Sequence, residues 1–279
     1  MAENDGRYEQ VASSSINEYF DDIKLHAKDY KIRSLIILGE FEEASKIISK
    51  ESNQEFQKTY QYYLQFTQSQ SKSPINEFDS LIETNKSLWF IQTIGALYLV
   101  GTGRIDVAIE LLTNHENNLE SVLLLIELYL FQNKLSLAET ELKSASAYSH
   151  DNVIYNFAEA FINTYKNGED LRGPLYFYEE LSHQYPSYKT LLGQLILNLQ
   201  LKQFEEADVA LDQLKQLEGI NEDLLANEIT VNAIKGSDST EIKQHLENLN
   251  PNHPVLVDLN EKNSLFDNIV AKYAEQIQN

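Results

Sequence analysis

The stretch that decides the fold runs from residue 88 to residue 112. It reads Leu-Trp-Phe-Ile-Gln-Thr-Ile-Gly-Ala-Leu-Tyr-Leu-Val (88–100), Gly-Thr-Gly-Arg-Ile-Asp (101–106) and Val-Ala-Ile-Glu-Leu-Leu (107–112). Only Gln92 and Thr93 are polar in the first segment, which predicts a helix covered on more than one side. Gly101 and Gly103 allow a tight turn after it. From Ile105 onward, apolar residues recur at helical spacing, which predicts a second, amphipathic helix.

The same helix–turn–helix pattern recurs along the chain. Each second helix carries a small or helix-starting residue with an apolar residue four positions later. The first members of these pairs are Ala44, Pro74, Ala108, Ala138, Pro174, Ala207 and the degenerate Ile242. Their separations of 30 to 36 residues centre near the period of about 34 that is typical of tetratricopeptide repeats. A small residue fits this position because the two helices of a repeat touch there.

The repeat predicts an all-α fold, a right-handed tetratricopeptide-repeat α-solenoid closed by a C-terminal capping helix. We expect residues 1–15 to form a flexible acidic tail and residues 16–254 to form about seven helix pairs. Residues 255–279 are predicted to be the capping helix packed on the solenoid. The apolar side of that helix contains Leu259, Phe266, Ile269, Val270 and Tyr273. Pro74 and Pro174 are expected to start the second helices of their repeats.

Composition excludes several classes of function. The 43 acidic and 22 basic residues give a formal charge of −21, which repels nucleic acid and anionic membranes. No cysteine is present, so disulfides and thiolate metal sites are excluded. We expect no signal peptide, because residues 1–10 are polar, and no transmembrane helix, because no apolar run is long enough.

The sequence contains no pattern typical of an enzyme, and we expect no catalytic, cofactor-binding or metal-binding residues. The six histidines do not pair at ligand spacing, and Gly101-Thr-Gly103 follows a predicted helix instead of a strand. No Gly-x-Ser-x-Gly motif is present. An enzyme built on a helical-repeat scaffold is therefore a hypothesis without support in the sequence.

The first helices of the repeats predict an apolar partner-binding groove. Their expected groove positions lack a cluster of cations, which argues against a partner that presents a carboxylate peptide and favours a large hydrophobic partner. The alternative is that some of these side chains pack between neighbouring repeats. The predicted groove residues are Phe90, Leu97, Val100, Leu123, Leu130, Leu192, Ile196 and Leu199.

Specific segments resemble the epsilon subunit of coatomer, the COPI vesicle coat. The most specific segment is C-terminal and contains His253-Pro254, Lys262, Phe266-Asp267, Val270 and Tyr273-Ala274. Residues 39–44, 174–181 and 203–208 are similar to the first, fifth and sixth repeats of that family. The resemblance runs from about residue 16 to residue 274.

This resemblance implies a non-enzymatic coat subunit that needs no cofactor. It implies that the chain binds and stabilises the C-terminal domain of the alpha subunit, and through it joins the rest of the coat. The implied location is the cytoplasm, peripheral on Golgi membranes and COPI-coated vesicles, in retrograde Golgi-to-ER and intra-Golgi transport. The alternative is a tetratricopeptide-repeat adaptor of another cytosolic assembly.

Overall fold

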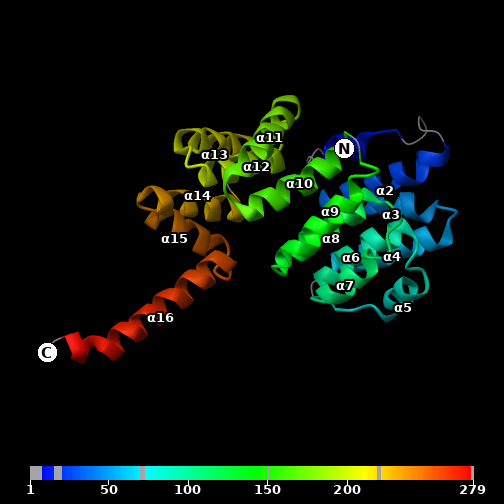
Figure 1. Cartoon of the computed structure of the whole chain (residues 1–279). Helices are drawn as coiled ribbons and strands as arrows, with labels where there is room; N and C mark the ends of the chain where they lie inside the picture. Colours follow the sequence, from blue (N-terminus) through cyan, green and yellow to red (C-terminus); the bar gives the residue numbers. More distant parts are fainter. Residues whose placement is uncertain (1–7, 16–20, 70–72, 150, 219–220, 278–279) are drawn as a thin grey trace. The chain divides into compact units, whose positions relative to one another are not determined.

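The computed structural model describes residues 8–15, 21–69, 73–149, 151–218 and 221–277. Every regular element among these residues is a helix, which confirms the all-α prediction (Figure 1). The chain divides into two compact units, Met1–Ser187 and Tyr188–Asn279. Each unit has a hydrophobic core of its own.

The first unit contains eleven α-helices and one 3-10 turn in the described residues. They are α1 (Tyr8–Ser13), α2 (Asp21–Ile37), α3 (Phe41–Ser49), α4 (Gln54–Gln68), α5 (Asn76–Thr84), α6 (Trp89–Gly101), α7 (Ile105–Leu112), α8 (Leu119–Phe131), α9 (Leu135–Ala145), α10 (Val153–Lys166), η2 (Glu169–Leu171) and α11 (Arg172–Gln184).

The second unit contains five helices in the described residues. They are α12 (Tyr188–Gln200), α13 (Phe204–Glu218), α14 (Glu222–Lys235), α15 (Thr240–Leu249) and α16 (Pro254–Ile277).

The helices between α2 and α15 pack as consecutive pairs. In the first unit α2 contacts α3, α4 contacts α5, α6 contacts α7, α8 contacts α9, and α10 contacts α11. In the second unit α12 contacts α13, and α14 contacts α15. First helices of successive pairs also touch, as α4, α6, α8 and α10 do in turn. Within the first unit each pair thus covers the apolar face of the next, as a repeat protein requires.

Small residues lie where the helices of a pair meet. Ala44, Ala108, Ala138 and Ala207 are all fully buried, in agreement with the repeat alignment. Pro174 is buried in the first turn of α11, as expected for a helix-starting proline. Pro74 is different, because it is exposed and lies two residues before α5 begins.

The turn inside most pairs has one repeated geometry. A backbone N–H donates to the carbonyl five residues earlier, from Glu40 to Leu35, Arg104 to Leu99, Lys134 to Tyr129 and Gln203 to Asn198, each at 2.8 Å. This bond is typical of a Schellman cap, which needs a left-handed residue just before the donor. Gly39 and Gly103 supply that residue without steric cost, whereas Asn133 and Lys202 adopt it as non-glycine residues.

The N-terminal segment differs from the expected flexible tail. Residues 8–13 form helix α1, which contacts α2. Ala12 packs against the core of the first unit, and the Lys31 ammonium donates to the Ser14 carbonyl at 2.7 Å. Residues 1–7 lie outside the described residues. The prediction missed α1 because a six-residue helix has too few apolar positions to show a period.

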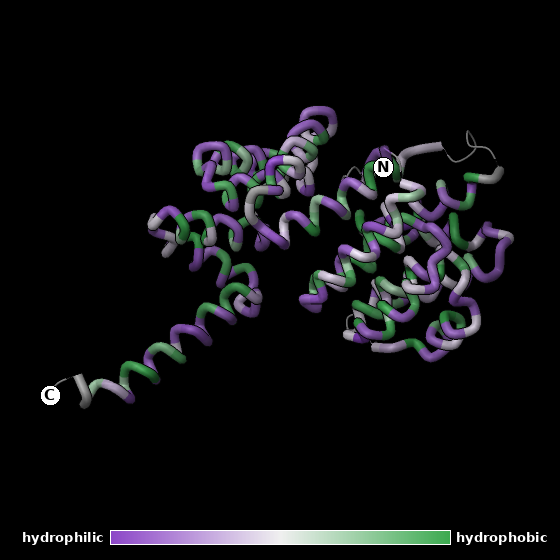
Figure 2. Tube along the Cα trace, viewed as in Figure 1, coloured by the Kyte–Doolittle hydropathy of each residue, from purple (hydrophilic) through white to green (hydrophobic). Residues whose placement is uncertain are grey.

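The C-terminal helix also differs from the expected cap. Helix α16 begins at Pro254, and Val255 and Leu256 of its first turn pack against α14 and α15. Residues 260–273 are all exposed. Hydrophobic and hydrophilic residues alternate in short groups along this helix (Figure 2). Of the five residues expected on the packed side, only Leu259 is half-buried. The helix is therefore amphipathic as predicted, but its apolar side is uncovered beyond the first turn.

We expect Ala138→Leu to lower the free energy of unfolding by about 1–3 kcal/mol, because a larger side chain overpacks the contact between α8 and α9. Ser136→Leu places the same side chain on the exposed face of α9 and should change stability by no more than about 0.5 kcal/mol. Chemical denaturation of both variants measures the difference. Equal midpoints would contradict the placement of Ala138 at the helix contact.

Candidate partner-binding groove

The structure divides the eight predicted groove residues between the two units. Five lie on α6 and α8 in the first unit, and three lie on α12 in the second. Val100 and Ile196 are exposed, at 39% and 37%. The half-buried side chains are those of Leu97, Leu123, Leu192 and Leu199, and the buried ones are those of Phe90 and Leu130.

Phe90 and Leu130 do not present a surface to a partner. Phe90 is 2% exposed and its ring lies 5.2 Å from that of Phe56 on α4. Leu130 is 9% exposed and belongs to the same core. For these two residues the groove interpretation is wrong and the alternative, packing between repeats, is correct. Consecutive first helices approach so closely that the residues between them are enclosed.

Helix α2 covers the N-terminal ends of the next first helices. The imidazole of His26 stacks on the indole of Trp89 with ring centroids 3.8 Å apart. Trp89 in turn meets Phe90 edge-on. The first turn of α6 is therefore covered by α2, and its last turn is where Val100 remains exposed.

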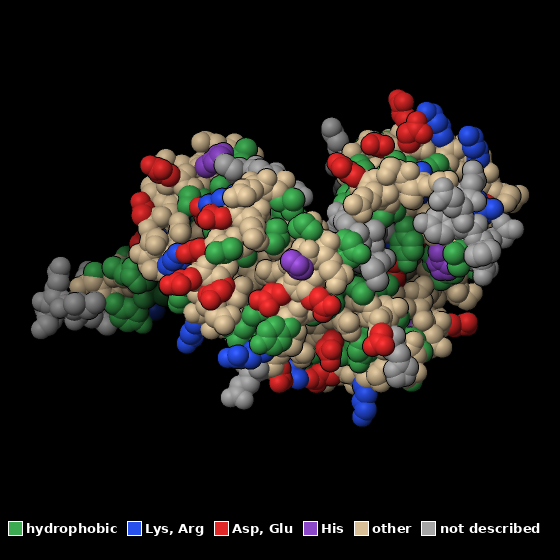
Figure 3. Space-filling view, turned by 90° about the horizontal axis from the view of Figure 1, so that it is seen from above, with side chains coloured by type: hydrophobic (Ala, Val, Ile, Leu, Met, Phe, Trp, Pro, Cys, Tyr) green, Lys and Arg blue, Asp and Glu red, His purple; other side chains and the backbone are tan. Residues whose placement is uncertain are grey.

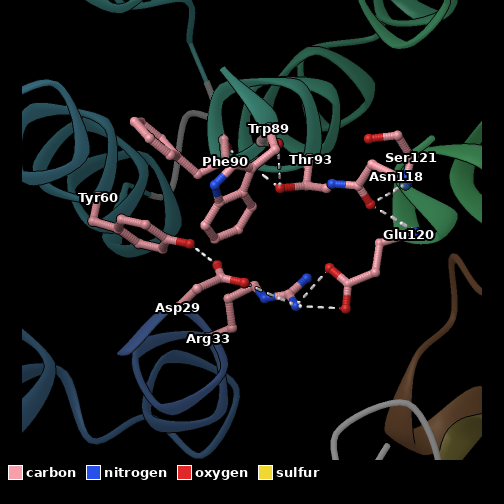
Figure 4. A network of polar contacts seen from close by, with 9 residues as sticks. All are labelled: Asp29, Arg33, Tyr60, Trp89, Phe90, Thr93, Asn118, Glu120 and Ser121. Atoms are coloured by element: carbon pink, nitrogen blue, oxygen red, sulfur yellow. Dashed lines mark hydrogen bonds and ion pairs between the residues drawn. The ribbon is translucent and has the colours of Figure 1, made fainter. Parts of the chain in front are cut away.

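A buried ionic network joins α2 to α8 beside these rings (Figure 4). The Arg33 guanidinium lies 3.2 and 3.1 Å from the two carboxylate oxygens of Glu120 and 3.2 Å from a carboxylate oxygen of Asp29. The Asp29 side chain is fully buried, and those of Arg33 and Glu120 are each 11% exposed. Residues 87 positions apart in the sequence are thus held together.

Hydroxyl and amide groups complete this network. Tyr60 on α4 donates its phenolic hydrogen to Asp29. Burial, followed by the charge of Glu120, raises the pKa of Tyr30, which lies beside this network. The Asn118 side chain caps α8 by accepting from the backbone N–H of Glu120 at 2.9 Å. Glu120 is consequently fixed in the first turn of α8, where the helix dipole also favours its charge.

The network is unusual for a repeat protein because it links the first helix pair to the fourth. Repeats in a solenoid normally contact only their neighbours. The first helices of the pairs line one side of the first unit. Near the N-terminal ends of α6 and α8, side chains of α2 therefore fill the space on that side. Sequence patterning alone does not pair Glu120 with Arg33. The available signal was a charged residue in the first turn of a mostly apolar helix.

A hollow in the first unit lies away from the predicted groove residues. A hollow of about 830 Å³ lies between α10 and α11. Its lining includes the carboxylates Glu159, Asp170 and Glu180 and none of the eight predicted groove residues. Within the part of the chain that the structure describes, no three histidine or carboxylate side chains are grouped as metal ligands, and no helix is long and apolar enough to cross a membrane.

Comparison with protein families shows the family to which the chain belongs. A family profile described as the coatomer epsilon subunit matches residues 5–274. The chain belongs to the coatomer epsilon subunit family. The resemblance detected in the sequence is thereby confirmed, and the family makes the chain a subunit of the COPI coat complex.

Curated relatives agree with this assignment. The chain is similar to coatomer subunit epsilon of Saccharomyces cerevisiae, with 27% identity over 266 residues that cover 88% of this chain and 87% of the relative. It is also similar to the probable coatomer subunit epsilon of Schizosaccharomyces pombe, with 27% identity over 66% of this chain and 65% of that protein. Similarity therefore extends across nearly the full length of the chain.

Solved structures show the fold alone. One chain of an APC/C hetero-tetramer superimposes with a TM-score of 0.63 at 15% identity, covering 88% of this chain and 49% of that one. A tetratricopeptide repeat protein from Parabacteroides merdae superimposes with a TM-score of 0.55 at 10% identity, covering 90% of this chain and 89% of that one. The tetratricopeptide-repeat prediction is confirmed by these likenesses.

We expect Arg33→Met to destabilise the protein by about 3–5 kcal/mol, because it leaves two buried carboxylates without their cation. Lys46→Met is the matched control, since it breaks the exposed Lys46–Glu43 ion pair of 2.6 Å. That change should cost no more than about 0.5 kcal/mol. Denaturant titration followed by circular dichroism measures both, and equal losses would contradict a structural role for the network.

Proposed function

We propose that this chain is a non-enzymatic structural subunit of the COPI coat that binds and stabilises the C-terminal domain of the alpha subunit. It would act in retrograde Golgi-to-ER and intra-Golgi transport, in the cytoplasm and on Golgi membranes and COPI-coated vesicles. The observation that carries this proposal is the family match over residues 5–274. A fold made of stacked helix pairs supports it, since such repeats commonly present extended surfaces to protein partners.

The proposed contact surface contains the predicted groove residues that remain accessible. In the first unit these are Leu97, Val100 and Leu123, on α6 and α8. In the second unit they are Leu192, Ile196 and Leu199, on one face of α12. Accessible apolar side chains of this kind suit a large, permanent interface, which is more apolar than a transient one. Each unit is proposed to contribute its own patch.

The chain offers matched pairs of neighbours that separate binding from folding. Ile196 is 37% exposed while the adjacent Leu195 is fully buried, and Val100 is 39% exposed while Leu99 is 2% exposed. A charge at the exposed member meets water in the free subunit. A charge at the buried member loses its hydration without a partner, which costs several kcal/mol.

We expect Ile196→Lys to weaken binding of the alpha subunit's C-terminal domain by roughly 2 kcal/mol or more if this side chain is central to the contact. Its melting temperature should stay close to that of the parent chain, whereas Leu195→Lys should unfold the second unit. The assay is co-expression with the alpha domain followed by size-exclusion chromatography, with melting measured on each free variant. Full complex formation by Ile196→Lys and Val100→Lys together would exclude the groove. Failure of the parent chain to bind would exclude the proposed partner.

Association with membranes is proposed to depend on the other coat subunits. The charge of −21 repels anionic lipid. We expect the pure protein to stay in the supernatant when anionic vesicles are sedimented at physiological salt. Co-sedimentation of the pure protein would show that it binds lipid without help.

A further inference from the structure

The apolar face of α16 has no partner within the described residues. Leu265, Phe266, Ile269, Val270 and Tyr273 are between 43% and 64% exposed. Hydrophobic side chains gather along this helix where it projects at the left of Figure 3. Single exposed apolar residues are ordinary, but a continuous stripe of this kind marks an interaction surface.

The spacing of the stripe is that of a coiled coil. Leu259, Phe266 and Tyr273 follow one another at intervals of seven residues, and Asn263 and Val270 lie four residues after the first two. These are the d and a positions of a heptad, with an average spacing of 3.5 residues. Leu256 continues the a series but is buried within its own unit. The accessible seam therefore begins at Leu259.

The residues beside the seam are complementary to those of an identical helix. In a parallel pair, each g position faces the e position five residues later on the other helix. Lys262 then faces Asp267 of the second copy, and Ile269 faces Ala274 of the second copy. Each of these contacts occurs twice by symmetry. One is an ion pair and the other is apolar, so both flanks of the seam match.

The seam also selects the parallel orientation. A parallel pair sets Asn263 against Asn263 of the second copy, and a lone buried asparagine pair at an a position favours a two-stranded, in-register coil. An antiparallel pair in which Phe266 meets Val270 would bring two Asp267 carboxylates to the same flank. It would also set the Asn263 amide against the ring of Tyr273. Like charges and a mismatched polar group both disfavour that arrangement.

A lipid surface fits this helix less well. Amphipathic helices that lie on membranes carry many lysines and arginines on the polar face. The sequence of α16 has four acidic residues, Asp258, Glu261, Asp267 and Glu275, and only two basic ones, Lys262 and Lys272. An anionic membrane would therefore repel it.

We propose that α16 is a self-association site that pairs with α16 of a second copy of this chain as a parallel two-stranded coiled coil. The seam is short, about four helical turns, so the area it buries falls below what a permanent dimer needs. The association is consequently reversible and depends on concentration. It becomes significant where many copies are held close together, since tethering raises the effective concentration of each helix.

Sedimentation equilibrium of the full chain from micromolar to several hundred micromolar tests this proposal. The average mass should rise with concentration from 32.1 kDa toward twice that value. Phe266→Glu and Val270→Glu should each keep the mass at that of the monomer across the range. Asn268→Glu introduces the same charge on the opposite, exposed face of α16 and should dimerise as the parent does.

A charge reversal tests the orientation and register. Lys262→Asp should weaken dimerisation at least tenfold, and the double variant Lys262→Asp/Asp267→Lys should restore it, because the exchanged charges again face each other. Circular dichroism checks that each variant remains helical, since Lys262 also pairs with Asp258 at 2.8 Å within the helix. Failure of the double variant to recover would overturn the parallel register.

Two further results would overturn the proposal as a whole. One is a parent chain that stays monomeric at every concentration while Phe266→Glu loses binding to the alpha subunit's C-terminal domain, which would assign the face to that partner. The other is co-sedimentation of the parent chain, but not Phe266→Glu, with anionic vesicles. We expect Phe266→Glu to bind the alpha domain as the parent does. The self-association proposal can therefore fail or succeed independently of the groove proposal.

Discussion

The structure depends on one constraint, which is that a single helix pair cannot bury its own apolar surface. Helix α6 shows this directly, because nine of its thirteen residues are buried and they point in several directions. Those residues meet α7 within the pair and α4 and α8 in the neighbouring pairs. Removal of any one neighbour would expose apolar surface at a cost of about 25 cal/mol per Å². A helix pair is thus stable only when it is packed between its neighbours.

The ionic network of Arg33, Asp29 and Glu120 adds a different kind of restraint to that stack. Apolar contacts between neighbouring pairs permit small changes of angle, because they are not directional. The network fixes the first pair to the fourth through bonds whose lengths and directions are specific. A buried ion pair contributes little net stability once desolvation is included. We infer that its main effect is to select one curvature of the first unit, and so to fix where the accessible residues of α6 and α8 lie.

The accessible apolar surfaces suit a subunit that works inside a larger assembly. Within the described residues they include Val100 at the last turn of α6, Phe131 at the end of α8, Ile196 on α12 and the stripe along α16. A charge of −21 keeps such a chain soluble and limits non-specific association. The specific contacts are therefore left to short apolar patches. The family assignment and the surface chemistry are consistent with each other on this point.

The sequence by itself determined the repeat and most of its helices. The spacing of Ala44, Ala108, Ala138 and Ala207 was sufficient because helix contacts impose a local requirement for small side chains, and local requirements are visible as a period. The family was also readable, since its C-terminal motif lies in a continuous segment.

Tertiary structure alone decided which apolar residues face water. Phe90 and Val100 belong to the same helix and the same predicted surface. Phe90 is nevertheless buried against Phe56 of α4 and Trp89, whereas Val100 is exposed. The pairing of Arg33 with Glu120 was likewise hidden, because the two are far apart in sequence and meet only after four pairs have stacked. Helix α16 is the converse case. The spacing of its apolar residues correctly predicted an apolar face. That spacing does not show whether another part of the same chain packs against the face.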